Sequence, residues 1–200
     1  MYSRTFGTSD WLTENDAYPP CQWNSAYRGP TVLSHAEVLV FTFKEGLLSP
    51  LAHDLKLRVT RFELDLDPAA NGAALKAEAG SLVVVTAMKK GHETPNALPA
   101  FAKSEIEKNI GSNGVLATKR FGTITFSSTR VSATEVEGAL TLHGVTKPVR
   151  GQRVDTRTHF TANFQIDQRD FGIKPYSAML GTLRIRPDLT IKITAPFTAP

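Results

Sequence analysis

The sequence predicts an all-β protein, a sandwich or a barrel of antiparallel strands, with one amphipathic helix. Three observations predict this fold class. From Glu37 onward, about eight short runs alternate apolar with polar residues, which is the period of a half-buried strand. Turn-forming residues separate the runs. The segment Pro99–Ile110 breaks this alternation, with apolar residues about four positions apart. Short strands that are separated by turn residues in this way are typical of sandwiches and barrels.

Each strand-like run is marked by its apolar residues. Most runs alternate, but Ser81–Met88 contains a continuous apolar stretch, which indicates burial on both faces of that strand. The turn signal DPAANG occupies Asp67–Gly72. In chain order the marker residues are Leu39, Phe41 and Phe43; Leu55, Leu57 and Val59; Phe62, Leu64 and Leu66; Leu82 to Val85; Ile124 and Phe126; Leu140 and Leu142; Phe160, Ala162, Phe164 and Ile166; and Leu183, Ile185, Leu189, Ile191 and Ile193.

The segment Pro99–Ile110 changes the period from two to about four. Ala102, Ile106 and Ile110 are four residues apart, so they share one face of a helix. Proline suits the first helical turn, and Gly111 is a good stop. The sequence therefore predicts an amphipathic helix of about three turns, laid against the strands or across one end of them.

Composition fits one globular domain. Hydrophobic residues make up 41% of the 200 residues and charged residues 21%. The excess of 23 basic over 19 acidic residues gives a net charge of +4, without a block of five like charges. Nucleic-acid binding needs a focused basic face, so we expect no nucleic-acid partner.

Residues 1–30 read as an irregular N-terminal extension, which leaves residues 31–200 as the β domain. Trp11 and Trp23 favour packing of the extension on the domain, with partial disorder as the alternative. Cys21 is the only cysteine, so an intrachain disulfide is excluded. No apolar run reaches the length of a signal peptide or a transmembrane helix, which predicts a cytoplasmic protein.

Several short motifs look chemical but lack their partners. HETPN at His92 ends in Asn96 where a zinc protease has a second histidine, and Pro95 would break the helix. The DFG triplet at Asp170–Gly172 occurs without the other kinase motifs. The histidines at positions 35, 53, 92, 143 and 159 show no short metal-ligand spacing. We therefore expect no catalytic residues, no metal and no cofactor.

Two segments carry a family resemblance. GALTLHGVTKPV at Gly138–Val149 and IDQRDFGI at Ile166–Ile173 resemble the YceI family, whose members have a GxLTxHGVTKPV strand and a later DRxDFGI. A helix ending in EIE and a later strand like FGTITF occupy the same places here. The resemblance covers about Val38 to Phe197. The chain departs from it at FKEGLLSPLAHDLKLRV, where many members have a KHxG-type segment.

The resemblance implies a lipocalin-like antiparallel β-barrel around a long apolar ligand, such as a polyisoprenoid or a quinone-like lipid. We therefore expect binding, sequestration or transport of a lipid, and no enzyme activity. Arg150 and Arg153 are candidates to meet a phosphate headgroup at the mouth. The residues expected to contact the ligand are Phe41, Phe43, His53, Leu57, Phe126, Leu142, Phe164, Ile166 and Phe171.

Alternatives stay open at this point. The first alternative is a packed barrel that acts as an interaction module, because strand period does not distinguish a hollow barrel from a filled one. A lipid-acting enzyme that uses His53 with a carboxylate is the second, although His53 and Asp54, as neighbours on a strand, would face opposite sides. Many YceI proteins are exported and some form homodimers, which leaves a periplasmic location and a homodimer open.

Overall fold

A computed structural model gives the structure of the protein and describes residues 35–45, 53–67, 72–178 and 183–196. The expected extension over residues 1–30 lies outside the described residues, as do residues 68–71 of the predicted turn. The elements are β1 (Glu37–Glu45), β2 (Asp54–Val59), β3 (Phe62–Asp67), β4 (Gly72–Glu78), η1 (Ala79–Ser81), β5 (Leu82–Lys89), β6 (His92–Thr94), α1 (Ala100–Gly111), β7 (Thr123–Val131), β8 (Glu135–Leu142), β9 (Val145–Asp155), β10 (His159–Asp167), η2 (Gln168–Phe171), β11 (Ser177–Ala178) and β12 (Leu183–Pro196).

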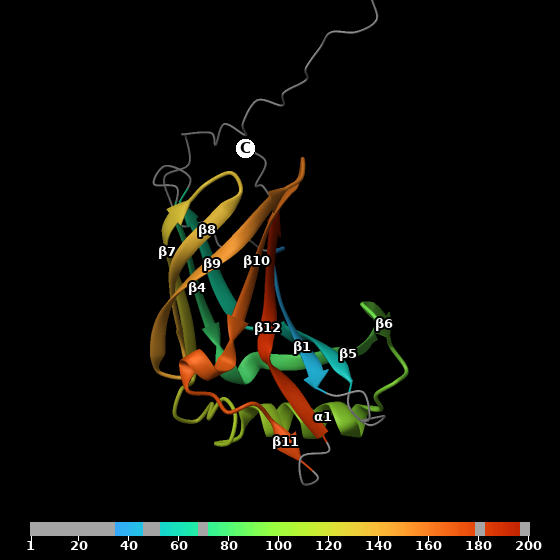
Figure 1. The fold of residues 1–200 in the computed structure, drawn as a ribbon. Helices are drawn as coiled ribbons and strands as arrows, with labels where there is room; N and C mark the ends of the chain where they lie inside the picture. The colour runs from blue at the N-terminus through green and yellow to red at the C-terminus, as the bar shows by residue number, and fades with distance from the viewer. Residues whose placement is uncertain (1–34, 46–52, 68–71, 179–182, 197–200) are drawn as a thin grey trace, which may run out of the picture.

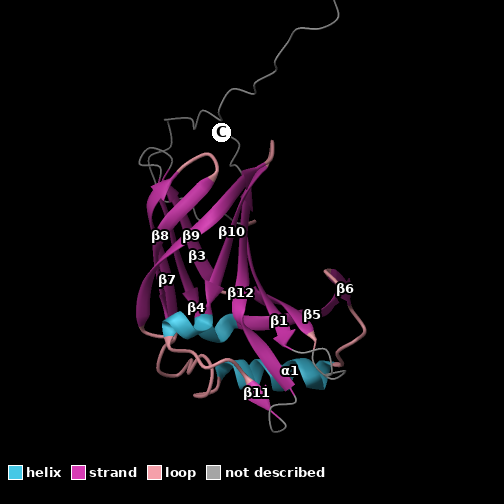
Figure 2. Ribbon diagram, viewed as in Figure 1, coloured by secondary structure: helices cyan, strands magenta, loops and turns pink. Residues whose placement is uncertain are grey.

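The predicted fold class is confirmed. The described strands form one antiparallel sheet in the order β3-β4-β7-β8-β9-β10-β12-β1-β2-β5-β6, with β11 paired to β12. The sheet curls into a barrel, and α1 lies across its lower end as drawn in Figure 1. Figure 2 shows that the helical segments gather at this end. The predicted helix is also confirmed, shifted by one residue at each boundary.

One long bent hairpin closes the barrel. β2 runs almost directly into β3, and β4 runs through η1 into β5. Within this hairpin β2 pairs with β5 and β3 pairs with β4, while β1 flanks β2 and β7 flanks β4. The hairpin therefore joins the two ends of the sheet, because β3 and β4 lie at one end of the strand order and β2 and β5 lie near the other. At its bend the Thr60 amide donates to the Ser81 carbonyl at 3.1 Å, and the Glu78 amide donates to the Arg61 carbonyl at 3.0 Å.

Aromatic side chains fill the barrel above this bend. Phe126 and Phe164 meet edge to face, with ring centroids 5.4 Å apart, inside the largest group of buried apolar residues. Two glycines make room for them. A Cβ on Gly138 would lie 2.5 Å from the Phe126 ring, and one on Gly151 would lie 2.7 Å from the Phe164 ring. The rings therefore lie against bare backbone of β8 and β9.

We predict that Gly151→Ala destabilises the protein by about 1–3 kcal/mol, because the added methyl group overpacks the core against Phe164. The control is Gly80→Ala, since a Cβ there would have open space. Urea unfolding of both variants measures the difference. Equal stability of the two variants would contradict this account of the packing.

Candidate ligand-binding site

A cavity of about 300 Å³ occupies the lower half of the barrel, beneath the packed aromatic residues. Alternate residues of the surrounding strands line it, as the period of two requires. On β2 these are Leu55, Leu57 and Val59, and on β12 they include Leu189 and Ile191. The exposed wall area is therefore mostly carbon, with a few polar groups that are described below.

The helix α1 closes the cavity on the side where the ladder is incomplete. β6 pairs only with Ala87–Lys89, so the earlier part of β5 has a free backbone edge. The Val84 amide donates to the Glu107 carboxylate at 2.7 Å, and the Lys103 ammonium donates to the Val85 carbonyl at 2.7 Å. Two side chains one helical turn apart thus satisfy the edge of a strand that would otherwise be open.

The apolar face of α1 points into the cavity. Ile106 and Ile110, two of the three residues that predicted the helix face, line it together with Leu98 from the preceding turn. Leu57 and Val84 form a small buried cluster against which this face packs. The helix therefore supplies one wall of the cavity in addition to covering the strand edge.

The two resemblance segments meet at the same end of the barrel. His143, in the tight β8–β9 turn, lies with Nδ1 3.3 Å from the Phe171 carbonyl oxygen, and its ring centroid is 4.4 Å from that of Phe121. Phe171 is only 1% exposed. Gly172 follows it with φ of 71°, a left-handed conformation that favours glycine. These contacts fix η2 as the floor of the cavity.

Asp167 anchors the start of η2. Its carboxylate accepts a hydrogen bond from the Arg169 amide at 2.9 Å and pairs with the Arg169 guanidinium. The side-chain hydrogen bond from Arg169 holds the pKa of Asp167 below its usual range. The residues on either side of Asp167, Ile166 and Gln168, line the cavity, as does Ile173. The IDQRDFGI segment thus has a structural role around the cavity.

Four of the predicted ligand contacts lie in the cavity wall. His53, Leu57, Leu142 and Ile166 line it. Asp54 faces away, and its Oδ1 accepts the Lys44 amide at 2.8 Å. The expectation that His53 and Asp54 do not pair therefore agrees with the structure. Contact of the four residues with a ligand stays a prediction.

Phe41 and Phe43 lie on the outer face of β1, contrary to expectation. Val40 and Thr42 line the cavity, so the residues that alternate with them point away from it. Phe41 is paired in register with Lys56 on β2. Consistent with an outward position, the guanidinium of Arg186 lies 5.6 Å from the centre of the Phe43 ring.

Three other predicted contacts are buried without lining the cavity. Phe126 and Phe164 belong to the packed upper half of the barrel, and Phe171 lies within the floor. Strand alternation predicts burial for Phe126 and Phe164, and the structure buries both, but their rings pack against protein. Sequence period could not separate the two cases, because both place a side chain on the inner face.

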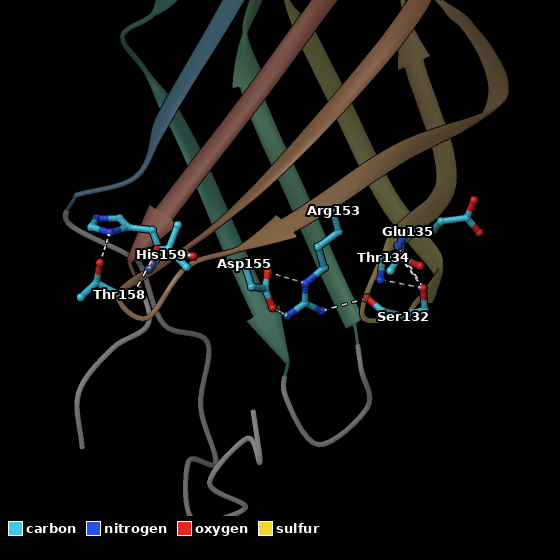
Figure 3. A network of polar contacts seen from close by, with 8 residues as sticks. Ser132, Thr134, Glu135, Arg153, Asp155, Thr158 and His159 are labelled. Atoms are coloured by element: carbon cyan, nitrogen blue, oxygen red, sulfur yellow. Dashed lines mark hydrogen bonds and ion pairs between the residues drawn. The ribbon is translucent and has the colours of Figure 1, made fainter. Parts of the chain in front are cut away.

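Neither arginine proposed for a headgroup lines the cavity. Arg150 pairs with Glu137 and Glu135 on β8. Arg153 is 7% exposed and donates to the Asp155 carboxylate and to the Ser132 carbonyl. Figure 3 shows the contacts of Arg153 with Asp155 and Ser132 beside the β7–β8 and β9–β10 turns, and Figure 1 places those turns at the end of the barrel away from α1.

Apart from His53, the polar residues of the wall are not among the predicted contacts. Thr42, Asn109, Gln168 and Tyr176 all line the cavity. Thr42 could have been found from the pattern that marks Val40 and Thr42 as one face of β1. Gln168 lies in the one-turn helix η2 and Tyr176 in an irregular segment, and both are too short for a period to give a signal.

Within the described ranges, no three His, Cys, Asp or Glu side chains come together as a possible metal site. None of the described helices is long and apolar enough to cross a membrane.

We predict that Glu107→Ala lowers the free energy of unfolding by about 1–2 kcal/mol, because the Val84 amide loses a charged acceptor. Hydrogen exchange at the Val84 amide should become faster. The control is Glu105→Ala on the exposed side of the same helix, expected to stay within about 0.5 kcal/mol of the parent. Unchanged protection of Val84 in Glu107→Ala would contradict this account of how α1 is attached.

Two solved structures agree with this fold, and a third protein, with a TM-score below 0.5, is named for its similarity alone. A crystal structure of BcnA from Burkholderia cenocepacia is 15% identical, covers 82% of this chain and 96% of its own, and has a TM-score of 0.53. A Campylobacter jejuni YceI mutant is 13% identical, with 78% and 92% covered and a TM-score of 0.53. A polyisoprenoid-binding domain from Saccharophagus degradans is 12% identical, with 84% and 96% covered and a TM-score of 0.49.

Sequence relatives are closer in identity but match less of the chain. A UPF0312 protein of Pseudomonas putida strain W619 is 37% identical over 105 residues, which cover 45% of this chain and 53% of that protein. The match thus spans about half the length of that relative. A family model described as the YceI-like domain matches residues 35–197, most of the chain. The chain therefore belongs to the YceI-like domain family.

Proposed function

We propose that this protein binds a long apolar lipid, of the polyisoprenoid or isoprenoid-quinone class, in the cavity between the barrel and α1. The observation that carries the proposal is the cavity itself, whose walls are aliphatic side chains from β1, β2, α1 and β12. Membership of the YceI-like family supports it, because the resemblance in the sequence implies such a ligand. Binding shields the chain from water and allows sequestration or transport.

The energetics of this binding need no specific chemistry. Burial of a methylene group contributes about 0.8 kcal/mol, so ten carbons contribute about 8 kcal/mol before the costs of association. The cavity volume of about 300 Å³ lies at the lower end of the range of small-molecule pockets, roughly 300–1,000 Å³. It therefore suits a segment of a polyisoprenoid chain better than the whole of a long one.

A binding role fits the site better than catalysis. Among the described residues, His53 makes no hydrogen bond with a carboxylate, and Asp54 is engaged by the Lys44 backbone. An acid–base pair would need hydrogen-bond reach between its members. The packed-barrel alternative is disfavoured by the cavity, and the hypothesis of an enzyme is disfavoured by this geometry. We also expect the purified protein to carry no stoichiometric metal or haem.

Filling the cavity tests the proposal. Val40 lines the cavity, so the phenyl ring introduced by Val40→Phe should occupy ligand space and cost less stability than the roughly 1–3 kcal/mol of overpacking a filled core. Binding of geranylgeraniol, followed by native mass spectrometry, should weaken at least several-fold. The control is Phe164→Trp in the packed half, where overpacking should cost about 1–3 kcal/mol. Unchanged affinity of Val40→Phe for geranylgeraniol would contradict the assignment of the cavity.

A further inference from the structure

The Thr42 hydroxyl is buried against the cavity without a hydrogen-bond partner in the described part of the chain. A hydroxyl offers one donor and two acceptor positions, and burial without a partner costs free energy. Buried polar atoms of this kind are rare in proteins, and each needs an explanation. Because Thr42 also lines the cavity, a ligand bound there is the candidate to supply the missing partner.

Two further polar residues stand at the same end of the cavity. Thr42 is paired in register with Leu55, and His53, two residues before Leu55, lines the cavity as Leu55 does. Tyr176 lines it as well, and its carbonyl accepts the amide of the wall residue Ile185 at 3.0 Å. Ile185 is paired with Lys44, two residues beyond Thr42 on β1. The three side chains therefore flank one corner.

Two of the other three polar residues of the wall are already engaged, and the third, Asn109, lies on α1. The Gln168 side-chain amide donates to the Arg186 carbonyl at 2.9 Å. The Glu78 carboxylate pairs with Arg61 at 2.6 Å. Thr42, His53 and Tyr176 are the polar wall residues that the strand register brings to one corner, which makes this corner best suited to bind a polar group of a ligand.

Away from this corner the cavity wall is mostly apolar, although Glu78, Asn109 and Gln168 also line it. Along the β1–β2 ladder, Leu55 lies opposite Thr42, whereas Val59 lies at the far end and is paired with Leu82. Val59, Leu82 and Ala79 line the cavity there. The register thus gives the cavity a polar end and an apolar end.

We propose that Thr42, with His53 and Tyr176, binds a neutral oxygen-bearing headgroup, a hydroxyl or a carbonyl, while the chain points toward Leu82. This inference rests on the proposed lipid-binding function and specifies the class of lipid. A phosphate head calls for Lys or Arg. The described residues that line the cavity include neither, and both arginines considered earlier for this role are ion-paired outside it.

The test compares two probes that differ only in oxygen: geranylgeraniol and the hydrocarbon with the same carbon skeleton but no hydroxyl. Thr42→Val removes the hydroxyl and keeps the shape of the side chain. We expect it to weaken geranylgeraniol binding about fivefold to tenfold, the equivalent of one hydrogen bond, and to leave hydrocarbon binding unchanged. The melting temperature without ligand should stay equal or rise, because an unpaired hydroxyl is lost.

Two variants sharpen the comparison. Thr42→Ser keeps the hydroxyl and should retain most of the affinity for the alcohol. Thr190→Val is the matched control on the outer face of β12, between the wall residues Leu189 and Ile191, and should change neither affinity. Equal effects of Thr42→Val on both probes, or no effect on either, would overturn the headgroup assignment and leave lipid binding intact. Failure of the parent protein to bind both probes would overturn the proposed function itself.

Discussion

The free edge of β5 is the constraint on which the cavity depends. A barrel strand needs a partner on both sides, and β6 covers only the last three residues of β5. The helix α1 takes the remaining edge through Glu107 and Lys103. A helix with its side chains is about 10 Å wide, whereas neighbouring strands are about 4.8 Å apart. A helix in the place of a strand therefore holds the walls apart and leaves space that a complete ladder would close.

The same barrel is filled in one half and hollow in the other. Above the hairpin bend, the rings of Phe126 and Phe164 cross the interior over Gly138 and Gly151. Below it, branched aliphatic residues and the face of α1 surround the cavity. The contact between His143 and the Phe171 carbonyl fixes the floor. The two segments that carry the family resemblance thus act together, as parts of one end of the cavity.

Much of this fold could be predicted from the sequence because strand and helix periods are local. Alternation places Leu57, Leu142 and Ile166 on the inner face, and the helix over Pro99–Ile110 follows from its spacing. Alternation fails on β1, where both faces carry residues compatible with burial: Phe41 and Phe43 on one, Val40 on the other. Which face is inner depends on pairing with β2 and β12, which is not local. Whether the barrel is hollow depends on α1 taking the place of a strand beside β5. No local pattern in the sequence indicates this replacement.

The mass of the purified protein under native conditions, followed by organic extraction, tests the central claim most directly. The account predicts one apolar molecule for each chain, released by the solvent and carrying a long hydrocarbon chain, with a neutral oxygen-bearing head. A native mass equal to that of the polypeptide alone, together with no uptake of added geranylgeraniol, would contradict it.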